Sequence, residues 1–543
     1  MPPVTSPRTW MRRCLLLTAI LAFLALALGL ERSPTSWPDS QLYAAIARSR
    51  QLYGVGIPSS LLNSPYATDH TRFYGPVFFD LAAWSFDAFG VSKWSFRLVS
   101  LGGALLLVVA GGVLGRQLSG SAGGWLWPLA LLALTPEVGL HARTGSMDTL
   151  AIGLELTALA VFVRGLALER HARWHGAAAG LVLALAALTT PRTYPFIAAF
   201  TLAGVLPFGL GLSRRQRVEQ LLPALVVCAS IVGVWAAGAH GNPLRWLRFV
   251  AYIARHEDTD VAILATATRN WSFSVANSIT AAFTIAGAIP ACWALSKRGV
   301  VPASSRDRAA AFALLTTTGT LVACVVLMNL TFTLSTYCAL PLFAVIAGLP
   351  RRYFAVGRPR LDRRLAACAV AALLVCDVTV AGVRAVRVAS TWAARDTDSL
   401  EAFLQAHVPS AADVIGPFDA YFFAVEQAGA HFWVVSPQSW ADWARWVPRI
   451  DPAGVGPLPR ARAGSSRFLI WQAERELPAR YACARSHLIG TYTPAPTHWF
   501  ANPILPQGAD TGYWLTDLYQ LPDDCPDGYD PTRLAIPYNA DVD

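Results

Sequence analysis

The sequence predicts a mostly α-helical, polytopic membrane protein, in which a bundle of about eleven transmembrane helices precedes a small α/β domain. Its composition is the first reason: 54% of the 543 residues are hydrophobic and only 14% are charged, whereas about a quarter are charged in ordinary soluble proteins. Apolar runs of roughly 20 residues, enough to cross about 30 Å of hydrocarbon, recur until about residue 388. The tail that follows is polar. We therefore expect a membrane domain over 1–388 and a soluble domain over 389–543.

The first apolar run, 14–30, follows Arg8, Arg12 and Arg13, and a basic start of this kind also begins signal peptides. We interpret the run as an uncleaved transmembrane helix, because no convincing small-residue cleavage site precedes Glu31. In either case the next segment, 31–97, is a long translocated loop. The further expected spans are 98–114, 125–140, 149–163, 176–190, 194–212, 219–239, 277–295, 309–328, 333–349 and 365–388.

The basic residues predict the orientation, since Lys and Arg in short loops favour the cytoplasmic side. Alternate short segments, beginning with the N-terminus, carry 20 of them, whereas the intervening short loops carry only Arg143 and Arg192. This bias places the N-terminus in the cytoplasm, and it places 31–97, 141–148, 240–276 and the tail outside. The net charge of +10 then needs no nucleic-acid partner, because the basic residues are spread between apolar runs.

The tail alternates strand-like runs with amphipathic stretches, as expected of a small α/β domain. The strand-like runs are DVIGP, HFWVVSP and RFLIW, and the amphipathic stretches include DSLEAFLQAH and WADWARWV. Cys483 and Cys525 lie in this polar tail, whereas the other cysteines fall in or beside apolar runs. A disulfide between them would suit an oxidising compartment, and the sequence leaves open whether they pair. No CxxC or Cys/His spacing indicates a zinc site.

The first external loop carries the main candidate for chemistry, Asp39. In SWPDSQLYAAIARS, Pro38 suits the first turn of a helix. Leu42, Tyr43 and Ile46 fall at helical spacing, which predicts a short amphipathic helix on the membrane surface. An acid in the first turn also complements the helix dipole, so a structural role is the alternative. We favour a functional role because further polar groups are expected on the same side of the membrane.

Asp148, in HARTGSMDTLAI, lies at the outer mouth of the fourth expected span, on the same side of the membrane as Asp39. Its alternative role is that of a helix cap. With His141 these two carboxylates would permit a divalent metal, but their spacing does not demand one. We therefore assign no required cofactor and leave a divalent metal on Asp39, Asp148 and His141 as an open alternative.

The external loops also supply cations and hydroxyl donors. Guanidinium groups suit phosphate oxygens because they offer paired donors with fixed geometry, so we expect a phosphate-bearing lipid as ligand. For each arginine, the alternative is an interfacial side chain that reaches toward the headgroups. The candidates are Arg72 and Tyr74 in HTRFYGP, Arg143 in HARTG, and Arg192 and Tyr194 in TTPRTYP.

The order of these motifs resembles the type C glycosyltransferase superfamily, and most closely its branch of aminoarabinose transferases and protein O-mannosyltransferase-like enzymes. The resemblance covers roughly 10–350, and it rests on Asp39 to Tyr43, the Tyr74-Gly75-Pro76 turn, the pattern from Phe89 to Leu98, Arg143 with Asp148, and Ser335 to Pro341. The chain departs from the branch at Ser40, which replaces a second acid. It also lacks the Lys of the aminoarabinose enzymes in the turn at Tyr74, which argues against aminoarabinose as the donor sugar.

This resemblance implies an enzyme that transfers a sugar from a polyprenyl-phosphate donor to an acceptor outside the cytoplasm, which is a lipid, a glycan or a protein. The attacking hydroxyl must lose its proton, so a carboxylate is the natural base, and we assign Asp39 and Asp148 as catalytic. A single attack would invert the anomeric configuration. Tyr43 and Tyr337, which lie in the matched motifs, are assigned to substrate binding. No Gly-rich nucleotide loop is visible, which agrees with a lipid-linked donor.

Two other classes of function fit a chain with many spans. A transporter or flippase would be expected to place ionisable residues near the midplane and often to show repeated halves, whereas here Glu155 alone is a midplane candidate. A scaffold that binds envelope glycans through its tail is the second alternative. The family branch implies a multi-pass protein of the plasma (inner) membrane.

Overall fold

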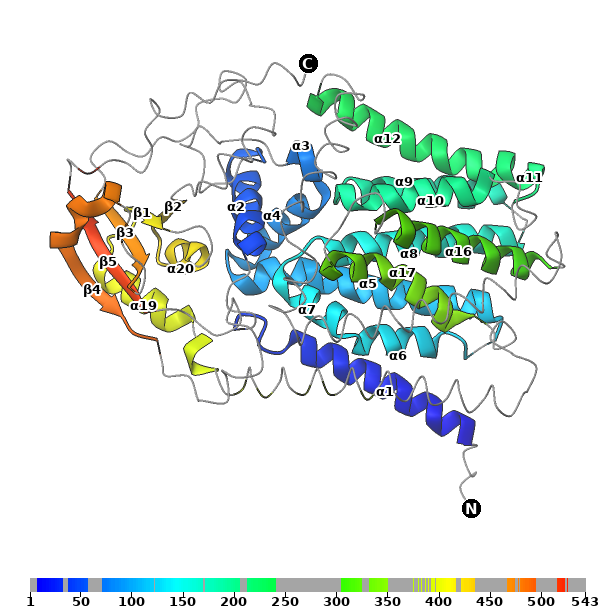
Figure 1. Cartoon of the computed structure of the whole chain (residues 1–543), viewed down its shortest axis with the longest axis horizontal. Coiled ribbons are helices and arrows are strands. Elements are labelled where there is room, and N and C mark those ends of the chain that lie inside the picture. Colours follow the sequence, from blue (N-terminus) through cyan, green and yellow to red (C-terminus); the bar gives the residue numbers. More distant parts are fainter. Residues whose placement is uncertain are drawn as a thin grey trace. The chain divides into compact units, whose positions relative to one another are not determined.

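The chain forms two compact units in the computed structural model (Figure 1). Unit 1 comprises Met1–Leu28, Ser100–Ala142 and Met147–Ala385, and unit 2 comprises Gly29–Val99, Arg143–Ser146 and Val386–Asp543. The structure describes residues 7–32, 38–56, 71–121, 123–168, 171–205, 212–240, 304–324, 332–349, five isolated positions between 375 and 389, 392–395, 397–416, 421–434, 466–473, 477, 479–494, 515–522 and 525.

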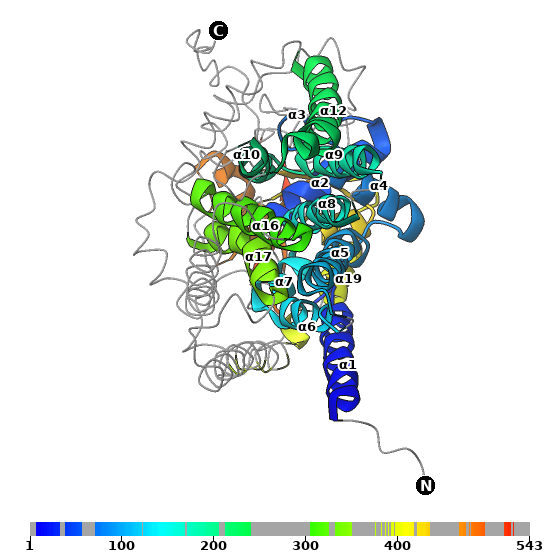
Figure 2. The same cartoon turned by 90° about the vertical axis from the view of Figure 1, so that its right-hand side faces the viewer.

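Unit 1 is helical, and its helices lie side by side and roughly parallel, as the two views show (Figures 1 and 2). Among the described residues, three helical segments are long and apolar enough to cross a membrane, namely Lys93–Ser119, Asp148–Leu168 and Arg214–Ala239. The elements that lie wholly or largely in unit 1 are α1 (Pro7–Ala27), α5 (Lys93–Ser119), α6 (Leu126–Leu134), α7 (Pro136–Thr144), α8 (Asp148–Leu168), α9 (Ala172–Ala187), η2 (Pro191–Thr193), α10 (Tyr194–Val205), α11 (Arg214–Gln216), the π-helical η3 (Arg217–Leu221), α12 (Leu222–His240), α16 (Ser305–Val322) and α17 (Phe332–Gly348).

The expected span at 125–140 differs from the structure, which breaks it into α6 and α7 at Thr135. Thr135 has extended backbone angles, φ −62° and ψ 122°, because Pro136 disfavours the helical conformation in the residue before it. The expected span at 277–295 lies outside the described residues. The one at 365–388 is described only at isolated positions.

Small residues let the helices of unit 1 approach closely. A Cβ atom added to Gly176 would lie 2.2 Å from the Gln220 carbonyl oxygen, and one added to Gly180 would lie 2.2 Å from that of Ala224. Both glycines are on α9, four residues apart, which is the spacing of the small-residue interfaces of membrane helices. They allow α9 to pack directly on the backbone of η3 and α12.

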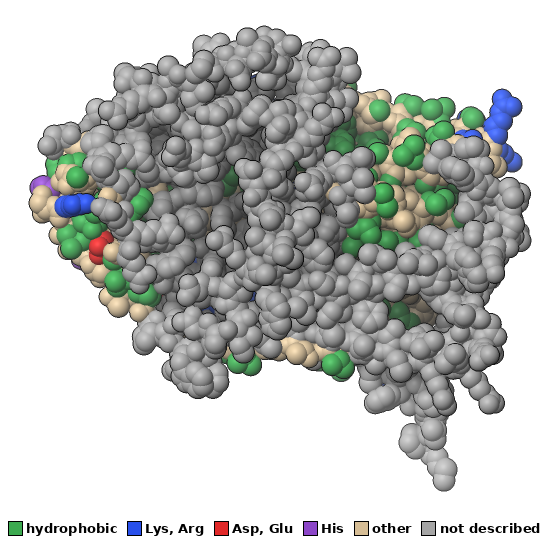
Figure 3. Space-filling view, in the orientation of Figure 1, with side chains coloured by type: hydrophobic (Ala, Val, Ile, Leu, Met, Phe, Trp, Pro, Cys, Tyr) green, Lys and Arg blue, Asp and Glu red, His purple; other side chains and the backbone are tan. Residues whose placement is uncertain are grey.

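Aromatic side chains fill the space between three other helices of unit 1. Phe162 of α8 lies 4.7 Å from Phe200 of α10 and 4.8 Å from Phe312 of α16, measured between ring centroids. The outer surface is also apolar: Figure 3 shows hydrophobic side chains over the helices of unit 1 and basic side chains near the α11 end. Leu222, Val226 and Val234 of α12 are among the exposed hydrophobic residues. Such an outer surface suits lipid rather than water.

Unit 2 combines the first loop with the tail. The tail contains the predicted sheet, whose strand order is β2-β1-β3-β5-β4, with β1 parallel to β2 and β3, and β5 antiparallel to β3 and β4. The predicted strands in DVIGP, HFWVVSP and RFLIW and the helix in DSLEAFLQAH are confirmed, whereas WADWARWV lies outside the described residues. The elements of unit 2 are α2 (Pro38–Tyr53), α3 (Thr71–Tyr74), α4 (Val77–Phe89), η6 (Ala393–Arg395), α19 (Thr397–His407), β1 (Asp413–Gly416), α20 (Phe422–Gln427), β2 (His431–Val434), β3 (Arg467–Gln472), η8 (Ala479–His487), β4 (Leu488–Tyr492) and β5 (Thr516–Leu521).

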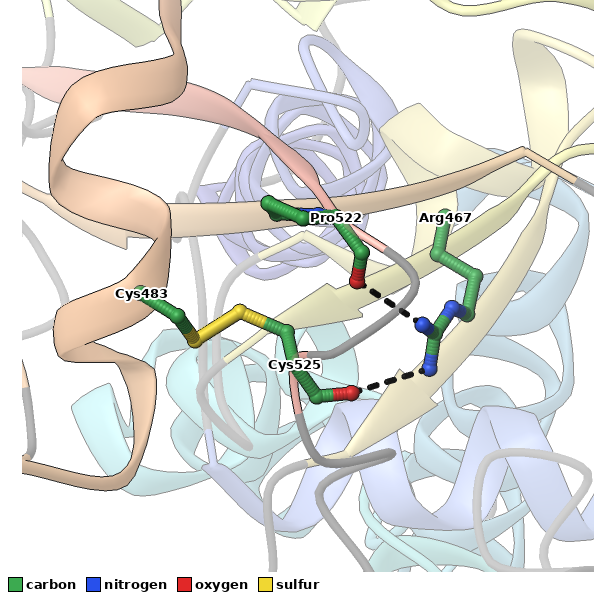
Figure 4. The surroundings of a disulfide bond; sticks show 4 residues. All are labelled: Arg467, Cys483, Pro522 and Cys525. Atoms are coloured by element: carbon green, nitrogen blue, oxygen red, sulfur yellow. Dashed lines mark hydrogen bonds between the residues drawn. A yellow bond between two sulfur atoms is a disulfide. The ribbon is translucent and has the colours of Figure 1, made fainter.

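Cys483 and Cys525, whose pairing the sequence left open, form a disulfide with their Cα atoms 5.9 Å apart (Figure 4). The bond joins η8 to the chain that follows β5. Beside it, the Arg467 guanidinium of β3 donates to the carbonyl oxygens of Pro522, at 2.9 Å, and of Cys525, at 3.3 Å. The disulfide and this arginine therefore tie one end of the sheet together.

Candidate active site

Asp39 is the second residue of α2, so the expected helix in SWPDSQLYAAIARS is present. The Asp39 side chain lies outside the described part of the structure, but its neighbour Ser40 is buried and its hydroxyl donates to the carbonyl oxygen of Thr144. This hydrogen bond joins the start of α2 to a residue 104 positions further along the chain. The backbone that carries Asp39 is thus anchored at its first turn.

Two of the predicted tyrosines lie together in the core of unit 2. Tyr43 of α2 is 4% exposed and meets Tyr74 of α3 edge to face, with ring centroids 5.4 Å apart. Phe79 of α4 also packs edge to face with Tyr43, with ring centroids 5.9 Å apart. Arg50, two turns further along α2, donates to the Asp80 carboxylate at 2.8 and 2.5 Å. These contacts fix α2 against α4.

Two arginines of unit 2 converge on the turn that follows α1. Arg143 donates through Nη2 to the Gly29 carbonyl oxygen at 2.9 Å, and Arg97, which is 1% exposed, donates to the Leu30 carbonyl oxygen. Gly29 adopts φ +65°, which glycine accommodates without steric cost. Arg143, which the sequence predicts to bind phosphate, therefore stabilises the backbone of this turn.

The clearest charged pair of the candidate site lies in unit 1. The Arg192 Nη1 donates to both oxygens of Asp148, at 3.1 Å to Oδ1 and 2.9 Å to Oδ2. Asp148 opens α8 and is 5% exposed, whereas the Arg192 side chain is 23% exposed. The hydroxyl of Thr190 accepts from the Arg192 amide and so caps η2, which holds the arginine backbone in place. The Asp148 carboxylate thus fixes the orientation of the partly exposed Arg192 guanidinium.

Further polar groups surround this pair within unit 1. Glu155 lies two turns along α8 from Asp148, is 4% exposed and lies near the Thr193 side chain. Tyr194 opens α10, and its hydroxyl donates to the Ala187 carbonyl oxygen at 3.5 Å. The short η2 therefore places Arg192, Thr193 and Tyr194 at the ends of α9 and α10, with the first two facing acids of α8.

Comparison with solved structures gives end-to-end similarity. The chain matches ArnT, an aminoarabinose transferase, from Cupriavidus metallidurans bound to undecaprenyl phosphate, over 97% of this chain and 100% of that chain, with a TM-score of 0.56 and 13% identity. It also matches the same protein in the apo state, over 92% and 97%, with a TM-score of 0.53 and 15% identity. The chain has the type C glycosyltransferase fold. No protein-family model and no curated protein matches the sequence.

The type C glycosyltransferase fold agrees with the resemblance read from the motifs. Of the remaining predicted residues, Arg72 is partly buried in α3, and Tyr337 belongs to α17, where its side chain lies outside the described residues. His141 is buried in α7. Within the part of the chain that the structure describes, no three His, Cys, Asp or Glu side chains gather closely enough to hold a metal ion.

Sequence reasoning did not assign a site role to three polar residues that this fold buries. Arg97 and Lys93, at 1% and 2% exposure, belong to the Phe89–Leu98 motif, which could have indicated them. Gln41 is 2% exposed, and neither its amide nitrogen nor its amide oxygen has a hydrogen-bond partner among the described residues. No pattern in the sequence indicates that Gln41 is buried.

Proposed function

We propose that this protein transfers a sugar from a polyprenyl-phosphate donor to an acceptor outside the cytoplasm. The observation that carries the proposal is the similarity of fold over nearly the whole of both chains to a transferase bound to undecaprenyl phosphate. The motif resemblance supports it independently, because the motifs belong to the sequence itself and do not depend on the fold. The sugar and the chemical class of the acceptor stay open.

The transfer reaction requires a base that takes the acceptor proton and a cation that stabilises the leaving phosphate. The acceptor hydroxyl oxygen bonds to the anomeric carbon, its proton passes to the Asp39 carboxylate, and the bond from that carbon to the phosphate oxygen breaks. Polyprenyl phosphate leaves with the electron pair. Because one attack displaces one leaving group, the anomeric configuration is inverted. Asp39 is therefore our candidate general base.

Arg192 is the leading candidate for the leaving phosphate. Charge that develops on a leaving group is best stabilised by a cation already fixed in position, because no reorganisation is then needed during the reaction. The Asp148 carboxylate and the Thr190 cap provide that fixation. Arg72 and Tyr194 are the secondary candidates, whereas the contacts of Tyr74 and Arg143 favour a role in shaping the loop.

We further propose that the protein spans the plasma (inner) membrane, with the N-terminus in the cytoplasm and the tail outside. The Lys and Arg bias of the short loops supports this orientation. The disulfide between Cys483 and Cys525 supports an oxidising surrounding for the tail, since such bonds persist in secreted and periplasmic compartments.

The test is a transfer assay with purified protein in vesicles, a panel of radiolabelled polyprenyl-phosphate monosaccharides, and an extract of envelope acceptors. We expect transfer by the wild type from at least one donor. Asp39→Asn should lower kcat by about 100- to 10,000-fold, because the amide cannot accept the proton. Glu219→Gln, in η3, is the matched control and should transfer at the wild-type rate.

Two results would count against the proposal. Folded wild-type protein that transfers no sugar from any donor, but carries the labelled lipid across the vesicle membrane, would favour a flippase. Transfer that is equal in the wild type and Asp39→Asn would keep the enzyme class but remove Asp39 as the base, and Asp148 would be the next candidate.

A further inference from the structure

Helix α2 is held on a second side by the tail. Besides its contacts with α4, it meets α20, the short helix between β1 and β2 (Figure 1). Arg48 of α2 and Glu426 of α20 form an ion pair with 3.3 Å between Nε and Oε2, although 378 positions separate them in the chain. Both residues belong to unit 2. The first loop and the tail are thus joined by a specific charged contact.

This ion pair is well defined and partly shielded from water. The Arg48 side chain is 24% exposed and that of Glu426 9% exposed. Arg48 also donates through Nη1 to the Gln51 side chain at 2.7 Å, which fixes the direction of its guanidinium. Burial raises the pKa of Glu426, and Arg48 partly offsets this effect. Loss of either partner would leave the other charge poorly solvated, so the pair favours one position of α2 on α20.

Aromatic contacts extend the connection in both directions. Phe423 of α20 packs on Phe96, with ring centroids 6.1 Å apart, and Phe96 packs on Phe78 of α4 at 5.8 Å. Phe422, which precedes Phe423 on α20, contacts the Phe423 ring at 5.3 Å and meets Phe432 of β2 at 6.4 Å. A continuous set of packed residues therefore runs from the sheet of the tail through α20 to the helices of the first loop.

We propose that the C-terminal domain positions the helix that carries Asp39, and that the Arg48–Glu426 ion pair is the contact through which it does so. Arg48 lies nine residues after Asp39 on one uninterrupted helix, about 14 Å along its axis. A helix of this length moves as a rod, so a shift at Arg48 displaces the backbone of Asp39. This inference rests on the proposed function, because it takes Asp39 as the group that must be placed. It makes Arg48 and Glu426 positioning residues rather than catalytic ones.

The test reverses the charges in the full-length protein, with Arg48→Glu, Glu426→Arg and the double variant. Each single reversal places like charges together and should lower kcat by about 10- to 100-fold, because small misplacements of a catalytic group have effects of this size. The KM for the lipid-linked donor should not change. The double variant restores opposite charges and should recover most of kcat, which a merely destabilising substitution would not do.

Hydrogen exchange of α2 gives a second readout that needs no substrate. Amides of α2 should exchange faster in each single reversal and return toward the wild-type rate in the double variant. Arg215→Glu, which breaks the exposed pair of Arg215 with Glu219 at 3.0 Å, is the control for charge reversal and should change neither readout. Arg48→Gln and Glu426→Gln replace the reversals if these fail to fold.

The outcomes separate this inference from the proposed function. Single variants that exchange and transfer like the wild type overturn the positioning role and leave the transferase standing. A double variant as slow as the single variants also overturns it. If the wild type itself transfers no sugar, the proposed function fails and the positioning of a catalytic helix falls with it, whereas the exchange data still report whether the tail holds α2.

Discussion

At the scale of single residues, the Asp148–Arg192 pair is the part of the candidate site with the most complete geometry. Asp148 is almost fully buried, whereas Arg192 keeps about a quarter of its side chain exposed. Part of the attraction between the two charges offsets the cost of removing the Asp148 carboxylate from water. The carboxylate therefore orients the exposed cation more than it stabilises the fold. The pair should therefore matter for catalysis.

A double-mutant cycle tests this coupling. Asp148→Asn and Arg192→Gln should each lower kcat of sugar transfer by about 10- to 1,000-fold, as expected on loss of one preorganised electrostatic group. In the double variant kcat should fall by much less than the product of the two single-variant factors, because the second substitution acts on an interaction that is already broken. Arg192→Lys should not restore the rate, since a lysine cannot reproduce the guanidinium geometry. Independent effects in the double variant would contradict a shared role.

At the scale of elements, the α9 interface depends on Gly176 and Gly180. Gly180→Ile should force α9 away from α12, because even its Cβ would lie 2.2 Å from the Ala224 carbonyl oxygen. We expect a loss of stability of about 1–3 kcal/mol, measured as a lower midpoint of thermal unfolding in detergent. Gly233→Ile on α12 is the matched control, since a Cβ there meets no atom of the described residues within 4 Å. Equal midpoints for the two variants would show that the close approach of these helices does not matter.

At the scale of the whole molecule, the disulfide closes a loop in the tail across 42 positions. Loss of such a constraint raises the entropy of the unfolded chain, and Cys483→Ser with Cys525→Ser should destabilise the tail by about 4 kcal/mol. Limited proteolysis measures this as faster cleavage of the tail, with the membrane helices unaffected. A reductant should have the same effect on the wild type and none on the double variant. Cys228→Ala, at a buried free cysteine, is the control and should keep the wild-type response to reductant.

Much of the fold could be predicted because its signals are local. A long apolar run needs a helix when it is surrounded by lipid, which predicted α5, α8 and α12. The strands β1, β2 and β3 followed from short apolar runs between polar residues. LIGTY and TDLYQL are not such clear apolar runs between polar residues, so β4 and β5 were not predicted. The break before Pro136 was missed although its signal is present, because the apolar run around it is continuous.

The candidate site was predicted only as a set of residues. The sequence placed Asp148 and Arg192 in external loops, and the structure pairs them across 44 positions. Tyr43 and Tyr74 were predicted as ligands, and they pack on each other in a core, which no spacing along the chain reveals. Gln41 was not assigned a role because its burial depends on every neighbouring side chain.

The sequence by itself determined the helical membrane domain, the α/β tail, and the loops that hold the polar groups, because periodicity, apolar length and charge bias act over short stretches of chain. Only the tertiary structure decided which polar groups meet. The Arg48–Glu426 and Asp148–Arg192 pairs and the Cys483–Cys525 disulfide depend on how distant segments pack. Packing is set by the shape and volume of many side chains at once, and no single stretch of sequence contains that information.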